Sequence, residues 1–164
     1  MLKPHYVQFA SYNRWANRRL YDEAARLPDD ARGRTLGLFF GSLHGTLNHL
    51  LVADRIWMHR FTGEGPQPSR LNEILYDDFA ALREAREHED ERIVHYVGGL
   101  AEADFDATLV YRTTAGQPQT QPRRDALAHF FNHQTHHRGQ AHAALTILGV
   151  PEPQPLDLLY MQRS

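Results

Sequence analysis

A long run of regularly spaced apolar residues in the first half of the chain most restricts how the chain can fold. Between residues 35 and 61, apolar side chains recur in alternating steps of four and three, interrupted only by Asp54. This spacing places them on one face of an α-helix, in the pattern typical of helices that pack into bundles. The run consists of Leu36, Phe40, Leu43, Leu47, Leu50, Asp54, Trp57 and Phe61. We therefore expect a helix over about residues 35–61.

Three further segments have helical periodicity, over about residues 4–27, 77–97 and 123–148. Pro28, the Gly98-Gly99 pair and Gly149 are suitable ends for them. Between the last two segments, residues 104–122 contain a β-prone stretch and a turn signal, which indicate a short hairpin or an ordered loop. The expected fold is all-α: an up-down-down-up four-helix bundle, with this hairpin or loop as the crossover before the last helix.

The composition narrows the class of protein. The 164 residues suit one domain spanning residues 1–164, and 41% hydrophobic with 23% charged residues is an ordinary globular balance. The net charge is -2 and there is no basic block, so we expect no nucleic-acid partner. No apolar run approaches a membrane span and no signal core is visible, so a cytoplasmic location is expected. Cysteine is absent, which excludes disulfides, thiolate metal ligands and a protein thiol nucleophile.

Histidine is unusually frequent, with 11 residues, five of them between residues 129 and 142. In the last predicted helix His137 lies in the apolar stripe, and His133 lies one turn earlier and about 40° to one side. Two histidines four residues apart share one helix face and can bind the same ion. The pair His129 and His133 has the same spacing but turns further from the stripe, and His136 lies further off still. His142 points to the opposite side.

The second predicted helix offers a third histidine. His49 falls on a line of small and apolar residues, so we expect it to face the bundle interior, where it can supply a ligand from another helix. A separate polar line is expected to face solvent; it consists of His44, Asn48, Arg55 and His59. The alternative interpretation is that all these histidines are ordinary helical residues that bind no metal.

Several other polar residues have an expected position or contact. Asp54 is expected either to accept the second ring N–H of a ligand histidine or to pair with an arginine such as Arg14 or Arg18. Gln140 lies on the same face as His133 and is a candidate to orient a bound water or ligand. Arg138 points away from that face, so we expect it to form an ion pair between helices or between subunits rather than to bind a substrate. The charged residues 83–92 are expected to face water, and the tail after Pro151 to pack on the bundle or on a partner subunit.

Three segments make the chain similar to a known family. Residues 129–140 (HFFNHQTHHRGQ) closely resemble the signature helix of the DinB/YfiT superfamily. Residues 12–17 (YNRWAN) and 48–57 (NHLLVADRIW) look like that family's first- and second-helix patterns. The resemblance implies a four-helix bundle that holds one nickel or zinc ion on three histidines, one from the second helix and two from the last. Carried over by position, these are His49, His133 and His137. It also implies a homodimer.

The resemblance suggests chemistry as well. Relatives include transferases and isomerases that use a low-molecular-weight thiol such as bacillithiol, mycothiol or glutathione. Three neutral nitrogen ligands leave coordination positions open and leave the ion its full charge, so it would acidify a thiol or a water. A thiol S-transferase acting on small electrophiles is thus the first hypothesis. A metal-dependent hydrolase, for which only Asp54 and Gln140 are candidate helpers, and a non-catalytic metal-binding or stress-response protein are the alternatives.

Overall fold

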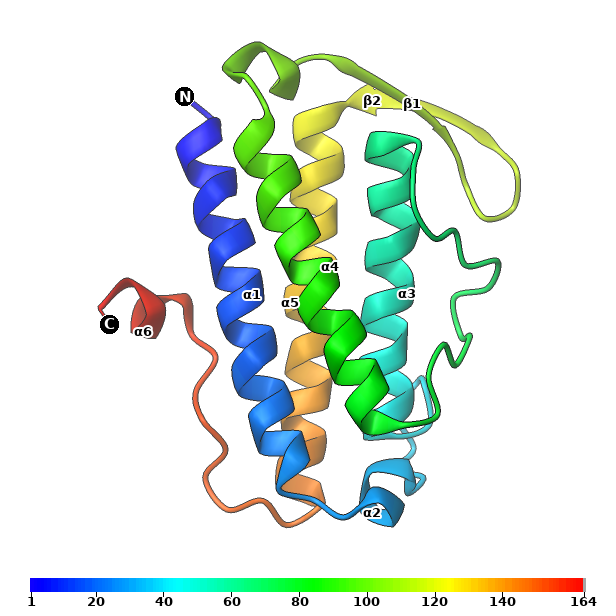
Figure 1. The fold of residues 1–164 in the computed structure, drawn as a ribbon, viewed down its shortest axis with the longest axis vertical. Coiled ribbons are helices and arrows are strands. Elements are labelled where there is room, and N and C mark those ends of the chain that lie inside the picture. The colour runs from blue at the N-terminus through cyan, green and yellow to red at the C-terminus, as the bar shows by residue number, and fades with distance from the viewer. Residues whose placement is uncertain (164) are drawn as a thin grey trace.

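Four long helices form the body of the protein, as the computed structural model of residues 1–163 shows (Figure 1). They are α1 (Lys3–Ala25), α3 (Leu43–Thr62), α4 (Phe79–Gly99) and α5 (Arg123–Ile147). The helices α1 and α5 run down the bundle in the view of Figure 1, and α3 and α4 run up. Each long helix packs against two others, α1 and α3 both contacting α4 and α5. The predicted all-α, up-down-down-up bundle is therefore confirmed.

Short elements connect the long helices. The segment α2 (Asp29–Gly33) leads from α1 to the start of α3, and α6 (Leu158–Gln162) lies in the tail. A 3-10 turn, η1 (Glu102–Phe105), precedes an antiparallel hairpin of β1 (Thr108–Arg112) and β2 (Pro118–Pro122). This hairpin is the predicted crossover, and it lies over the end of the bundle where α3 finishes (Figure 1). Because α3 and α4 run in the same direction, residues 63–78 must return along the outside of α3.

The start of α3 differs from the prediction. The helix begins at Leu43 rather than near residue 35, because Ser42 caps it by accepting a hydrogen bond from the Gly45 N–H at 3.0 Å. Gly41 precedes the cap with a φ of 77°, a left-handed conformation that suits glycine. Leu36 and Phe40 thus lie in a loop, outside the helical seam to which the periodicity assigned them. Gly45, which has no side chain, lets the carbonyl oxygen of Phe40 approach the first turn closely.

Two apolar clusters fill the bundle, one toward each end. The first contains Trp57, Phe61, Ile93, Phe105 and Phe130, and the second contains Leu20, Leu47, Leu82, Ala141 and Leu145 among others. A set of polar side chains from all four long helices, each at most 3% exposed, lies in the core as well. We call it the buried polar network; it consists of Asn13, Asn17, Asp54, Arg86, Asp90, Gln134 and Arg138.

Ion pairs hold the centre of this network together. The Arg86 guanidinium contacts Asp54 at 2.7 Å and Asp90 at 3.1 Å. Asp54 also accepts a hydrogen bond from the Gln134 amide. Two arginines and two aspartates balance the formal charge, which is the condition under which buried charges are tolerated.

The amides of α1 complete the network. Asn13 and Asn17 donate to Asp90 at 3.2 and 2.9 Å, and their amide oxygens accept from Arg138. The expected contact of Arg138 with another helix is present, although it is made through amides rather than as an ion pair. The solvated face expected for residues 83–92 is wrong in part, because Arg86 and Asp90 point into the bundle.

The chain after α5 lies against the bundle, as predicted. The hydroxyl of Tyr12 donates to the carbonyl of Leu156 at 2.6 Å, and the His142 ring lies 2.9 Å from the carbonyl of Gln154. Within residues 1–163, no helix combines the length and the apolar character needed to cross a membrane.

Arg86→Ala is expected to lower the free energy of unfolding by about 3–5 kcal/mol, because it leaves two buried carboxylates without their cation. Arg83→Ala is the matched control on the same helix, since Arg83 pairs with Asp22 and Glu87 at a partly exposed position. Its loss is expected to cost about 1 kcal/mol or less. Urea unfolding of both variants measures the difference, and equal losses would contradict a stabilising role for the buried network.

Candidate metal centre

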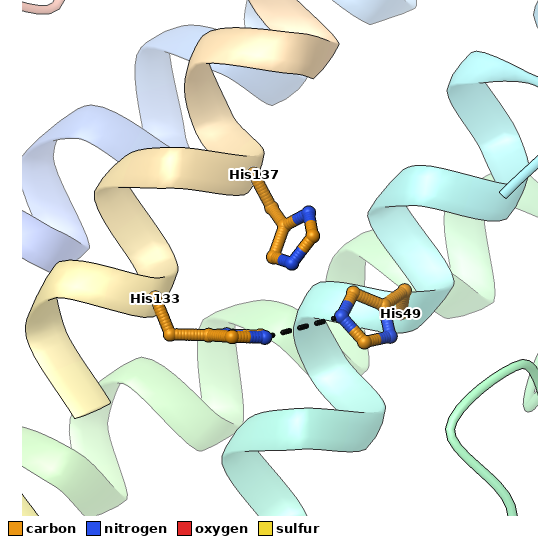
Figure 2. Close-up of side chains that lie close together, drawn as sticks. All are labelled: His49, His133 and His137. Atoms are coloured by element: carbon orange, nitrogen blue, oxygen red, sulfur yellow. Dashed lines mark hydrogen bonds between the residues drawn. The ribbon is translucent and has the colours of Figure 1, made fainter. Parts of the chain in front are cut away.

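Three histidines from two helices converge on one point between α3 and α5 (Figure 2). His49 comes from α3, and His133 and His137 from successive turns of α5. One ring nitrogen of each lies within 4.8 Å of the others, so the cluster could hold a metal ion. His49 is buried and the other two are half-buried, so the point where they converge lies close to the surface.

The ring of His49 is held from two sides. Its Nδ1 lies 2.8 Å from the carbonyl oxygen of Leu71, in the loop that runs outside α3. A carbonyl can only accept, so Nδ1 donates its proton and the lone pair of a neutral His49 is on Nε2. The ring of Phe40 stacks on the imidazole at 3.6 Å, with 14° between the planes. These contacts direct Nε2 toward α5.

The side chain of Gln140 orients the second ligand candidate. Its amide oxygen lies 2.8 Å from Nδ1 of His137, which therefore donates and leaves the lone pair on Nε2. Hydrogen bonding to the other ring nitrogen is the usual way in which proteins fix the orientation of a metal-binding histidine. Gln140 thus contacts a histidine, where the sequence suggested a contact with bound water or ligand.

The distance between two ring nitrogens fits an ion. Nε2 of His49 lies 3.3 Å from Nε2 of His133. Around a tetrahedral ion with metal–nitrogen bonds of about 2.0–2.1 Å, two ligand nitrogens are about 3.3 Å apart. The donor set of three imidazole nitrogens suits zinc, nickel and other first-row divalent ions, and it leaves coordination positions open.

Burial keeps the three rings neutral. Burial first, and the neighbouring histidines second, lower the pKa of His49 to about 4 and that of His133 to about 3. Burial also lowers the pKa of His137. A histidine ligand must be unprotonated, so at neutral pH each ring can offer a lone pair without first releasing a proton.

The other candidate residues lie elsewhere. His129 and His136 are exposed; their rings contact Trp57 and His137, and neither belongs to the cluster. Asp54 faces the core of the bundle and pairs with Arg86. The predicted pair with an arginine is therefore present, with Arg86 in place of Arg14 or Arg18, and it replaces the predicted contact with a ligand histidine.

Sequence reasoning missed the residues that support His49. Asn48, expected in solvent, is fully buried, and its amide oxygen accepts from the N–H groups of Leu75 and Tyr76 at 2.9 and 3.1 Å. It thereby ties the loop that carries Leu71 to α3. The carbonyl of Leu71 is a backbone group, so no side-chain pattern could have revealed its contact with His49. Phe40, which the periodicity places in the core seam, stacks on His49 instead.

The stability of the metal-free protein is expected to fall as the pH drops from about 6.5 toward 4. An unfolded histidine has a pKa near 6.5, so the unfolded state binds more protons than the folded state in this interval. His133→Gln removes one such group and is expected to make the pH dependence shallower, whereas His136→Gln, at an exposed position on the same helix, retains it. Chelator-treated protein unfolded in urea at several pH values measures the slopes. Parallel curves for His133→Gln and the unaltered protein would contradict the expectation.

Comparisons with known proteins show the family and confirm the fold. The DinB family model matches residues 1–163. Protein DinB of Bacillus subtilis (strain 168) is 26% identical over 145 residues, which cover 84% of this chain and 83% of that protein. The crystal structure of a DinB-like protein from Bacillus cereus ATCC 10987 has the same fold, with a TM-score of 0.68 at 18% identity over 92% of this chain and 95% of that one. The chain belongs to the DinB family.

Proposed function

We propose that the protein is an enzyme that binds one divalent ion, nickel or zinc, on His49, His133 and His137 and uses a low-molecular-weight thiol to modify small electrophiles. The observation that supports this most is the convergence of three neutral imidazoles beside the surface, with no carboxylate among them. A site with open positions is typical of catalytic rather than structural metal centres.

The charge of the site favours a thiol. A divalent ion bound by three neutral ligands keeps its full charge and would lower the pKa of a thiol or water that reaches it. The three histidines would hold that ion, and the contacts of His49 with Leu71 and of His137 with Gln140 would keep the ligand nitrogens directed at it. The chain has no cysteine, so the thiol must be a separate molecule. The external sulfur would lose its proton to solvent and attack carbon, displacing a halide or opening an epoxide.

The alternatives have less support. A hydrolase of this kind needs a general base near the bound water. Asp54 is not positioned for this role because it is buried in an ion pair with Arg86, and the amide of Gln140 is not a base. A non-catalytic metal-binding or stress-response protein requires only the histidine cluster. The homodimer and the cytoplasmic location that the sequence suggested remain predictions.

Protein purified without a histidine tag is expected to carry about one divalent ion per chain. His133→Ala is expected to weaken binding at least about a hundredfold, since losing even an outer hydrogen-bond partner of a ligand costs about 10–100-fold. His129→Ala, one turn away on the same helix, serves as control and should bind normally. Elemental analysis and calorimetric titration measure both quantities. Full occupancy in His133→Ala, or loss of the ion in His129→Ala, would show that the ligands are assigned wrongly.

Metal-loaded protein is expected to consume electrophiles only when a thiol is present. An epoxide, an alkyl halide and an activated alkene would each be incubated with bacillithiol, mycothiol or glutathione, and the conjugate measured by mass spectrometry. The rate should fall to background in His133→Ala. Consumption without any thiol would instead support the hydrolase, and inertness across the whole panel would support the non-catalytic protein.

A further inference from the structure

A polar pocket lies beside the β1–β2 hairpin. Its volume is about 300 Å³, and it is bounded by α3, the loop that follows it and the turn of the hairpin. We call it the hairpin pocket. Most of its walls are side chains with N–H or O–H donors: Arg60, Gln67, Ser69, Arg112, Thr113 and Thr114.

The hairpin pocket carries positive charge that no lining residue balances. No aspartate or glutamate lines it. Among residues 1–163, neither Arg60 nor Arg112 has an ion-pair partner, although most of the other arginines do. Arg112 uses one N–H group to donate to the Gly116 carbonyl at 2.9 Å, which braces it against the turn. In a chain whose net charge is negative, two unpaired guanidinium groups around one pocket attract an anion.

The position of Arg60 is set before any ligand arrives. Its guanidinium lies 4.5 Å from the ring centre of Trp57 and 4.8 Å from that of Tyr111, on β1. The side chain is half-buried, and this burial lowers its pKa, which shows that its charge is incompletely solvated. A guanidinium held on aromatic rings loses little conformational freedom when it binds a carboxylate or a phosphate.

A continuous line of side chains joins this pocket to the histidine cluster. Arg60 contacts Trp57, the Trp57 ring lies 5.1 Å from that of His129, and His129 lies 5.9 Å from His133. Ile56, another residue lining the hairpin pocket, lies two turns after His49 on the same face of α3. From His49 to Ile56, the first pocket residue along α3, the helix rises about 10 Å, a distance that a molecule about three extended residues long can cover.

We propose that the hairpin pocket binds a carboxylate or phosphate group of the small molecule that reacts at the histidine cluster. The binding of the anion follows from the charge and geometry of the pocket alone. Its assignment to the reacting molecule rests on the proposed function.

The two tryptophans of the chain provide a direct test on metal-free, full-length protein. Trp57 lies under Arg60, whereas Trp15 lies under Arg19 at 4.3 Å, outside the pocket, and is an internal control. Chelator-treated protein labelled with ¹⁵N would be titrated with inorganic phosphate or with succinate at constant ionic strength. We expect the indole N–H signal of Trp57 to shift and saturate while that of Trp15 stays in place.

Variants assign the effect to the pocket. Arg112 is exposed, so the Arg112→Gln variant should fold normally. It is expected to bind the anion about tenfold more weakly, because it loses one charge-assisted contact. Arg60→Gln should weaken anion binding by at least as much, and Arg19→Gln should leave it unchanged. Non-saturating shifts of both indole signals, or equal affinity in Arg112→Gln and the unaltered protein, would overturn the proposal.

The link to catalysis has its own readout. In the thiol assay, Arg112→Gln should raise KM for glutathione, which has two carboxylates, and leave KM for cysteamine, which has none, unchanged. Equal effects on both thiols would refute the link. If the metal-free protein binds anions but the metal-loaded protein consumes no electrophile with any thiol, the pocket is supported and the proposed function fails.

Discussion

The ion pair of Arg86 with Asp54 and Asp90 is the interaction on which the arrangement of the helices depends. Charges without solvent are stable only when they are paired and hydrogen-bonded, so a bundle that contains them must bring specific turns of all four helices together. Apolar packing alone tolerates sliding of one helix past another, because leucine side chains fit many registers. The buried polar network does not tolerate it.

The same network determines how the histidine cluster is assembled. Gln134 on α5 donates to Asp54 and to the carbonyl of Leu50, both on α3. His133 precedes Gln134 in the chain and His49 precedes Leu50, so the contact between Gln134 and Leu50 lies one residue from two of the three ligand candidates. On its buried side, the α3–α5 interface contributes Asp54 to the ion pair with Arg86. On its outer side, it places two imidazole nitrogens 3.3 Å apart.

The two sites occupy one side of the bundle and have different charge. The histidine cluster is neutral until an ion binds, because burial lowers the pKa of its rings. The hairpin pocket is positive at all times, because its two guanidinium groups have no counter-ion among residues 1–163. In the proposed reaction, the two sites would bind the reactive end and the anionic end of the same ligand.

The sequence alone predicted the four long helices and the inward direction of His49, His133 and His137, because these follow from periodicity within single segments. Its β-prone and turn residues predicted a hairpin or an ordered loop before the last helix, and left the choice between them open. The tertiary structure decided where α3 begins, that Asn48 and Arg86 are buried, and that Asp54 pairs with Arg86. It also excluded His129 and His136 from the cluster, which angular position alone had left open, and it brought the Leu71 carbonyl and Phe40 to His49. A local pattern shows which face of a helix is apolar, whereas the pairing of buried charges and the convergence of ligands depend on residues far apart in the chain. The start of α3 depends on a local cap, Ser42, which apolar periodicity does not reveal.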